Sequence, residues 1–293
     1  MSDVWEAFGI RSLSPSQLAK WSECRGMWYA KSRAKIKEDA GPAAWRGDAI
    51  ELGLLAALQG RPNAHATAMQ AFEARALEYA EKHDGELHEK HDEEEGKIGP
   101  ALTRAIQACE AEGIGAPKAH NPPVEAMLPG VSIKVFGKPD FTFEANADCG
   151  AHCVDLKTSG QIPSKPKDAN EAPKAKTEHA IAASLYAFAR KEKLGRILYI
   201  STAGNPRDAH RLITLDAAQI DFYVNAAVQI AKQIEATLTA ALAMQEFECV
   251  TAEQALAELC RPNMLAQGGG IYPVWKSDFA REAAQAVPAW KLA

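Results

Sequence analysis

The segment VFGKPDFTFEANADCGAHCVDLKTSG, residues 135–160, constrains the fold more than any other part of the chain. Two short β-prone runs each lead to an acid, Asp140 and then Asp155, and Lys157 follows two positions after the second acid. Because residues i and i+2 of a strand point to the same side, Asp155 and Lys157 must share one face. A strand that carries both charges beside a further acid is unusual for a core, and it indicates an active site.

The pattern around this segment predicts an α/β/α sandwich built on a mixed sheet of about five strands. Periodicity and turn residues predict helices at 14–36, 41–60, 63–82, 179–195 and 217–247. They predict strands at 124–130, 131–145, 151–159, 196–203 and 209–216. The first three strands can pair as a meander, and the helix that follows them permits a parallel neighbour.

The chain divides into three regions by composition and by the helices and strands that it predicts. Residues 1–120 are expected to form an N-terminal helical region, 121–250 the sheet with its helices, and 251–293 a C-terminal helical extension, all within one integrated domain. The start, MSDVWEAFGIRS, lacks a basic and then apolar signal layout, and no run approaches the roughly 20 apolar residues of a membrane span. We therefore expect a cytoplasmic protein without a membrane segment.

The formal charge of −5 gives no general attraction toward nucleic acid, so DNA binding would need a local basic surface. Such a surface could come from the end of the first helix and from a polar loop at 161–176 that carries Lys165 and Lys167. Ser14 and Ser16 are expected either to cap the first helix or to reach a phosphate.

The acids of the opening segment favour a hard, oxygen-lined metal site. Carboxylates of Asp140 and Asp155 that converge from neighbouring strands suit Mg2+ or Mn2+. Lys157 beside them would orient a water nucleophile or neutralise charge on a phosphoryl oxygen, as in phosphodiester hydrolysis. Taken alone, the Asp-Leu-Lys tripeptide also fits an exposed strand end with an ion pair, and Gly-Lys-Pro-Asp fits a turn.

In combination, these motifs resemble the RecB-like branch of the PD-(D/E)XK nuclease superfamily, which includes phage exonucleases of the lambda type. The resemblance covers roughly residues 13–215. It rests on LSPSQLAKWSECRGMWY, RGDAIELGLLAAL, GKPD and VDLKTS, in the family's order. It implies a restriction-endonuclease-like core and a DNA substrate.

Carried over by position, the resemblance implies that Asp140, Asp155 and the backbone carbonyl of Leu156 hold the metal and that Lys157 is the catalytic lysine. The RecB-like pattern places a histidine on the second helix where this chain has Glu51. Glutamate occupies that position in lambda-type relatives, so Glu51 is the expected third acid, with a solvated helix residue as the alternative. Glu125 ranks second as a competing acid.

The helix after the loop departs from the family pattern Gln-x-x-x-Tyr, because Ala182 stands where the glutamine would precede Tyr186. His179, Tyr186 and Arg190 fall near one helical face, so we expect them to contact DNA phosphates. The alternative for Tyr186 is half-buried packing.

Other metal-binding patterns are weaker. The close pair Cys149 and Cys153 has no second pair nearby, and the histidines of the charged stretch 82–97 fit either a metal site or a solvated connector. Relatives with an iron–sulfur cluster carry one early cysteine and three near the C-terminus. Since only Cys249 and Cys260 lie in that region here, we expect no cluster and a packed thiol at Cys24.

The expected function is a Mg2+- or Mn2+-dependent DNA nuclease, an exonuclease of phage or bacterial recombination or repair. The alternative is a nuclease-fold protein that binds DNA or a partner with little turnover, since the family glutamine and histidine are missing. A small-molecule enzyme is disfavoured, because no P-loop or GxGxxG fingerprint is present. A lambda-type assembly would add a homo-oligomer and a single-strand annealing partner.

Overall fold

The computed structural model describes residues 4–35, 39–145, 150–164, 174–248 and 250–260. Contacts divide the chain into two compact units, each built from several chain segments. Unit one comprises Met1–Glu38, Glu125–Gly137 and Phe222–Ala293, and unit two comprises Asp39–Val124 and Lys138–Asp221. Among the described residues, no helix is long and apolar enough to cross a membrane.

Unit one combines helices with a small sheet whose strand order is β1-β4-β3, in which β1 runs parallel to β4. Its strands are β1 (Ser12–Leu13), β3 (Val124–Met127) and β4 (Lys134–Gly137). Its helices are α1 (Val4–Ala7), α2 (Pro15–Glu23), α3 (Arg25–Ser32), α9 (Ala217–Glu248) and α10 (Ala252–Leu259). The first residues of β3 and α9 belong to unit two.

The single helix predicted at 14–36 is wrong, because the structure has two helices that meet at Cys24. Cys24 is extended, with φ −162° and ψ 114°, so it ends α2 and begins α3. The break lets Trp21 and Trp28 pack edge to face with ring centroids 4.9 Å apart. Seven residues of one continuous helix would have separated them by about 10 Å. Ser14 caps α2 in a capping box with Gln17, as one of its two expected roles requires.

Unit two contains a five-stranded mixed sheet in the order β2-β5-β6-β7-β8. Its strands are β2 (Ala119–His120), β5 (Phe141–Phe143), β6 (His152–Ser159), β7 (Leu194–Ser201) and β8 (His210–Leu215). The pair β6 and β7 is parallel, and the other three pairs are antiparallel. The predicted mixed sheet of about five strands flanked by helices is confirmed.

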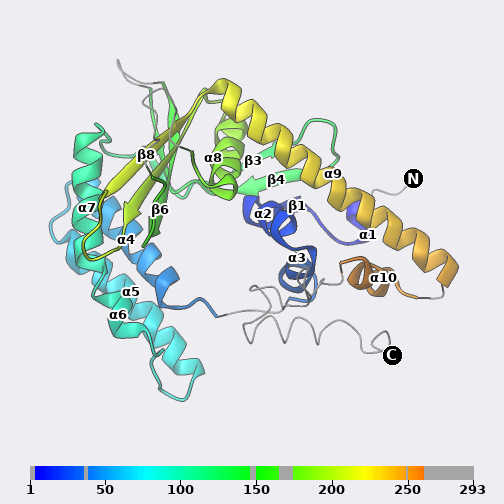
Figure 1. Ribbon diagram of the computed structural model, residues 1–293, viewed down its shortest axis with the longest axis horizontal. Coiled ribbons are helices and arrows are strands. Elements are labelled where there is room, and N and C mark those ends of the chain that lie inside the picture. The colour runs from blue at the N-terminus through cyan, green and yellow to red at the C-terminus, as the bar shows by residue number, and fades with distance from the viewer. Residues whose placement is uncertain (1–3, 36–38, 146–149, 165–173, 249, 261–293) are drawn as a thin grey trace. The chain divides into compact units, whose positions relative to one another are not determined.

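Helices cover both faces of this sheet. They are α4 (Pro42–Leu58), α5 (Ala64–Lys82), α6 (His91–Glu95), α7 (Ile98–Ala111) and α8 (Thr177–Arg190). Val154 and Leu156 point from β6 into the core formed with α4, α5 and α7. Cys153 points to the other face, where its thiol contacts the Ala183 carbonyl of α8 at 3.9 Å. Figure 1 shows α4 and α7 on one side of β6 and β8 and α8 on the other.

The strand predicted at 131–145 is wrong as one element, because the chain leaves one sheet and enters another at Lys138–Asp140. Before this point β4 belongs to the sheet of unit one, and after it β5 pairs with β2 and β6 in unit two. Pro139 explains the break, since proline lacks the N–H that a continuing ladder would need. The predicted meander of three strands is therefore replaced by pairing in two separate sheets.

The charged stretch 82–97 is more ordered than the predicted solvated connector. It contains α6, and Glu94 of this helix is only 7% exposed. Its carboxylate forms an ion pair with Arg46 of α4, whose exposure is 6%. Lys97 adds a second cation 2.7 Å from Glu94. A buried carboxylate requires such partners, and composition alone did not reveal them.

Candidate active site

Strand β6 sets the position of two of the predicted catalytic side chains. Alternation along this strand directs Asp155 and Lys157 to the face covered by α8, opposite to Val154 and Leu156. The Lys157 ammonium lies 2.7 Å from Oδ2 of Asp155, and their side chains are 28% and 3% exposed. The two residues thus form a largely enclosed ion pair at the middle of the sheet.

Asp140 joins this pair from the turn that precedes β5. Its Oδ2 accepts a hydrogen bond of 2.6 Å from the backbone N–H of Leu156, the residue between Asp155 and Lys157. Strand pairing explains this approach, since β5 lies antiparallel to β6 with Phe141 opposite Val154. The carboxylates of Asp140 and Asp155 therefore converge from neighbouring strands, as the sequence predicted.

The charges of this cluster act strongly on one another. Burial raises the pKa of Asp140 well above its ordinary value, and the negative charges of Asp155 and Glu51 add to the rise. Burial alone would lower the pKa of Lys157, but the Asp155 and Asp140 carboxylates outweigh it and hold that pKa above its ordinary value. Lys157 is therefore a permanent cation at neutral pH, and Asp140 carries its charge at an energetic cost.

The donor set fits a hard divalent cation. Oδ2 of Asp155 has the Lys157 ammonium 2.7 Å away and no other hydrogen-bond donor among the described residues. Asp140 uses one carboxylate oxygen on the backbone of Leu156, and no described residue donates to the other. Two carboxylates that retain free lone pairs offer the oxygen ligands that Mg2+ and Mn2+ prefer.

Glu51 of α4 approaches the same cluster, and its charge contributes to the raised pKa of Asp140. Its Oε1 lies 2.6 Å from Nε2 of His120 and 2.8 Å from Nδ2 of Asn121. The sequence analysis missed both partners, because each is about 70 residues from Glu51 along the chain and neither belongs to a motif. Their only sequence signal is two polar side chains at the end of a short strand, directly before Pro122.

The match to a family model decides the family. The model of the PD-(D/E)XK nuclease superfamily matches residues 12–263. The chain belongs to the PD-(D/E)XK nuclease superfamily. Members of this superfamily are nucleases, which hydrolyse the phosphodiester bonds of nucleic acid and generally use divalent metals such as Mg2+.

A solved structure agrees with this fold. The chain resembles a protein from Eubacterium rectale whose name gives it as a candidate exonuclease, with a TM-score of 0.54 and 13% identity over 96% of this chain and 92% of that one. At this identity the likeness shows the fold alone. A second structure, SSO0001, has a TM-score of 0.24 and 16% identity over 53% of this chain and 70% of that one, and carries no argument. No curated protein matches the chain.

Helix α8 brings two of its three predicted DNA contacts toward the acids of this PD-(D/E)XK site. Burial and the charge of Asp155 raise the pKa of Tyr186. Burial and the charge of Lys157 lower the pKa of His179, whose Nδ1 lies 2.9 Å from the Tyr199 hydroxyl. Both side chains therefore lie on the side of α8 that faces β6 and β7.

The structure does not bring Arg190 to this cluster. Arg190 lies about 6 Å further along α8 than Tyr186, at the end of the sheet where β7 begins. Its guanidinium is paired with Glu192 at 2.6 Å and lines a separate hollow of about 530 Å³. A shared helical face thus did not place all three residues at one site.

The remaining predicted contacts belong to unit one or fall outside the described residues. Glu125 and Ser14 belong to unit one, as does Ser16, whose hydroxyl lies 2.8 Å from that of Ser14. The Glu125 carboxylate is 3.2 Å from the Lys134 ammonium. Lys165 and Lys167 lie outside the described residues.

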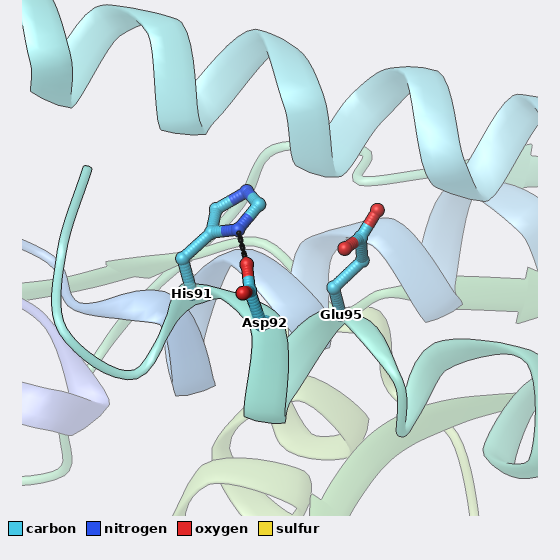
Figure 2. Close-up of side chains that lie close together, drawn as sticks. All are labelled: His91, Asp92 and Glu95. Atoms are coloured by element: carbon cyan, nitrogen blue, oxygen red, sulfur yellow. Dashed lines mark hydrogen bonds and ion pairs between the residues drawn. The ribbon is translucent and has the colours of Figure 1, made fainter.

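A second group of potential metal ligands lies on α6. Figure 2 shows His91 and Asp92 facing one another, with Nδ1 and Oδ1 2.8 Å apart, and Glu95 about one turn along the helix. Potential ligand atoms of the three lie within 4.8 Å of one another. The Asp92 side chain is 96% exposed, which is typical of a solvated acidic surface. Of the other histidines of this stretch, His83 stacks on Tyr79, and His88 lies against Trp45.

The cysteines that the structure describes are free thiols: Cys24, Cys109, Cys153 and Cys260. Cys153 is buried in β6, and burial raises the pKa of its thiol. Cys149 and Cys249 lie outside the described residues. Cys24 lies at the junction of α2 and α3 and is partly exposed.

Proposed function

We propose that this chain is a Mg2+- or Mn2+-dependent DNA exonuclease that acts in phage or bacterial recombination or repair. The observation that carries the proposal is the convergence of Asp140 and Asp155 on the segment that carries Lys157. The likeness in fold to a candidate exonuclease favours an exonuclease over an endonuclease in this proposal.

In this proposal Glu51, Asp140, Asp155 and the carbonyl of Leu156 hold the metal. When bound, the cation lowers the pKa of a water molecule and neutralises charge on the scissile phosphate. The carboxylates orient that water by accepting its hydrogen bonds. His179 and Tyr186 contact the phosphate backbone from α8.

Lys157 stabilises the negative charge that develops on a phosphoryl oxygen during attack. Its raised pKa keeps Nζ protonated, so this atom acts as a hydrogen-bond donor and does not accept the proton of the attacking water. The ion pair with Asp155 directs the ammonium toward the carboxylates and preorganises it before DNA arrives.

The test uses end-labelled linear and closed circular DNA with Mg2+, Mn2+ or EDTA. We expect metal-dependent loss of linear DNA, with Asp155→Ala and Lys157→Ala each reducing the rate by about 100-fold or more. Loss of circles as well would indicate an endonuclease.

The exposed pair Glu125 and Lys134 supplies the control, because it is another ion pair of a carboxylate and a lysine, 3.2 Å apart, in unit one. Glu125→Ala and Lys134→Ala should retain the rate of the unmodified protein. Loss of activity in Glu125→Ala but not in Glu51→Ala would reverse the ranking of the two acids. If no DNA is cut with any metal while DNA is still retained on a gel, the binding protein with little turnover becomes the better description.

A further inference from the structure

The two-residue segment His120 and Asn121 lies at the edge of the unit-two sheet, beside the proposed metal site. His120 ends β2 and pairs with Phe141 of β5, the residue after Asp140. Both side chains approach a single oxygen, Oε1 of Glu51, at 2.6 Å and 2.8 Å. The Glu51 and His120 side chains are 18% and 23% exposed, so water reaches them only in part.

Hydrogen-bonding chemistry selects one arrangement of this group. Nε2 of His120 and Nδ2 of Asn121 are also 2.9 Å apart. If Nε2 accepted a hydrogen bond from Asn121, it would carry no proton to donate to the nearby carboxylate oxygen, and the two lone pairs would repel one another. When Nε2 carries its proton instead, both nitrogens donate to Oε1, and the short distance between them follows from their common acceptor.

This arrangement leaves the second oxygen of Glu51 available. No residue that the structure describes forms a hydrogen bond with Oε2. The two donors therefore fix the rotation of the carboxylate and occupy one oxygen, while the other remains free to bind a cation. Carboxylate ligands of metal ions are commonly held in this way by neighbouring donors.

The same segment also fixes the position of Asp140. The backbone N–H of Asn121 donates to the Asp140 carbonyl at 3.0 Å. Asn121 has a φ of 50°, in the left-handed region that asparagine tolerates better than most residues. One short segment thus holds Glu51 through side chains and Asp140 through the main chain.

We infer that His120 and Asn121 are positioning residues, which hold the Glu51 carboxylate for a divalent cation and set its spacing from Asp140. The inference rests on the proposed function, since it concerns the same metal site. His120 acts through Glu51 and does not itself contact the DNA.

The test measures Mn2+ affinity by calorimetric titration. His120→Ala and Asn121→Ala should each weaken Mn2+ binding by about 10-fold, the lower end of the effect seen for residues that orient metal ligands. His120→Gln should recover most of the affinity, because its amide can donate to Oε1 as the imidazole does. His65→Ala, which removes an exposed histidine of α5, serves as the control and should bind Mn2+ normally.

A double-mutant cycle separates positioning from general damage to the fold. In the Glu51→Ala background, His120→Ala should cause no further loss of Mn2+ affinity, because the group through which it acts is already gone. An equal loss in both backgrounds would overturn the inference, as would normal affinity in both His120→Ala and Asn121→Ala. If the unmodified protein neither binds Mn2+ nor cuts DNA, the proposed function itself fails and the inference fails with it.

Discussion

At the scale of single residues, the candidate site places charges where the isolated protein would be more stable without them. Asp140 lies beside Asp155 and within the influence of Glu51, and its raised pKa reports that its charged form is disfavoured. Lys157 offsets part of this cost through its pair with Asp155. Such a cluster is stabilised by a bound cation, so stability and metal binding should be linked.

Asp140→Asn should make the metal-free protein more stable and remove its response to metal. A carboxyl whose folded pKa is raised binds more protons in the folded chain, so its contribution to stability is lost as pH rises from the unfolded pKa of about 3.8 through the folded value. In EDTA near pH 7.5 we expect Tm to rise by about 2–4 °C, the shift that about 1 kcal/mol produces in a domain of about 150–250 residues.

Thermal unfolding monitored by circular dichroism checks this prediction. The difference in Tm should shrink as pH is lowered toward about 4, because Asp140 then becomes protonated in the unmodified protein. Mn2+ should raise Tm of the unmodified protein and leave the variant nearly unchanged. A variant that is less stable than the unmodified protein in EDTA would contradict the argument.

The sequence predicted the shared face of Asp155 and Lys157, but it did not predict the contacts of Glu51. Strand alternation was enough to place Asp155 and Lys157 on one face, because that relation is local. The contacts of Glu51 with His120 and Asn121 span 69 and 70 residues, and no periodicity links residues so far apart. For Arg190, the sequence indicated its position on a face of the helix, which is local information, but it did not indicate the ion pair with Glu192.

At the scale of elements, α4 carries Glu51 and packs closely against its neighbours through Gly53. A Cβ atom at this glycine would lie 2.8 Å from Leu102 Cδ2 of α7 and 2.9 Å from Ala68 Cβ of α5. The other interior glycine of this helix, Gly47, has room, because a Cβ there would meet only Thr158 Oγ1, at 3.6 Å. The two glycines therefore form a matched pair for testing how tightly α4 is held.

Gly53→Ala should lower the free energy of unfolding, and Gly47→Ala should not. Overpacking costs about 1–3 kcal/mol, and the higher helix propensity of alanine returns about 1 kcal/mol, so we expect a net loss of up to about 2 kcal/mol at Gly53. Gly47→Ala should be neutral or stabilise by up to about 1 kcal/mol. Urea unfolding measures both, and equal stability of the two variants would show that α4 can shift to relieve the contact.

Some helices and strands could be predicted from the sequence and others could not. The helices α4, α5, α8 and α9 and the strand that carries Asp155 were predictable from the periodicity of their own residues, whereas α7 was not predicted. The change of sheet at Pro139 was not, since either side of it has the composition of a strand and only the pairing partners differ. The break at Cys24 was also hidden, because the residues on both sides favour helix.

At the scale of the whole molecule, an acidic protein must bind a polyanion through a local basic surface. The formal charge is −5, so long-range attraction toward DNA is absent. Lys165 and Lys167 lie in the polar segment 161–176, which follows β6 in the sequence. If these lysines contact phosphates, their effect must come from their location and not from the total charge.

Lys165→Ala combined with Lys167→Ala should weaken DNA binding and reduce its dependence on salt. Each lost phosphate contact lowers the slope of log K against log salt by about 0.7–0.9, so the pair should lower it by about 1.4–1.8. The control combines Lys82→Ala and Lys90→Ala, which lie in the acidic stretch 82–97. Both doubly substituted proteins remove two positive charges and change the net charge from −5 to −7. Fluorescence anisotropy at several salt concentrations distinguishes them, and equal slopes would assign the effect to total charge.

The hydrogen bond between Asn121 and Asp140 also bears on how the segment Glu125–Gly137 is joined to unit two. The segment Glu125–Gly137 leaves unit two after Val124 and returns at Lys138, and Asn121 and Asp140, which lie a few residues outside its two ends, are bonded at 3.0 Å. An insertion whose ends meet can be lengthened, exchanged or deleted at a small cost in loop entropy. Deletion of β3 and β4 would then leave β2 joined to β5 by a short connection, and it would remove none of the residues of the proposed metal site.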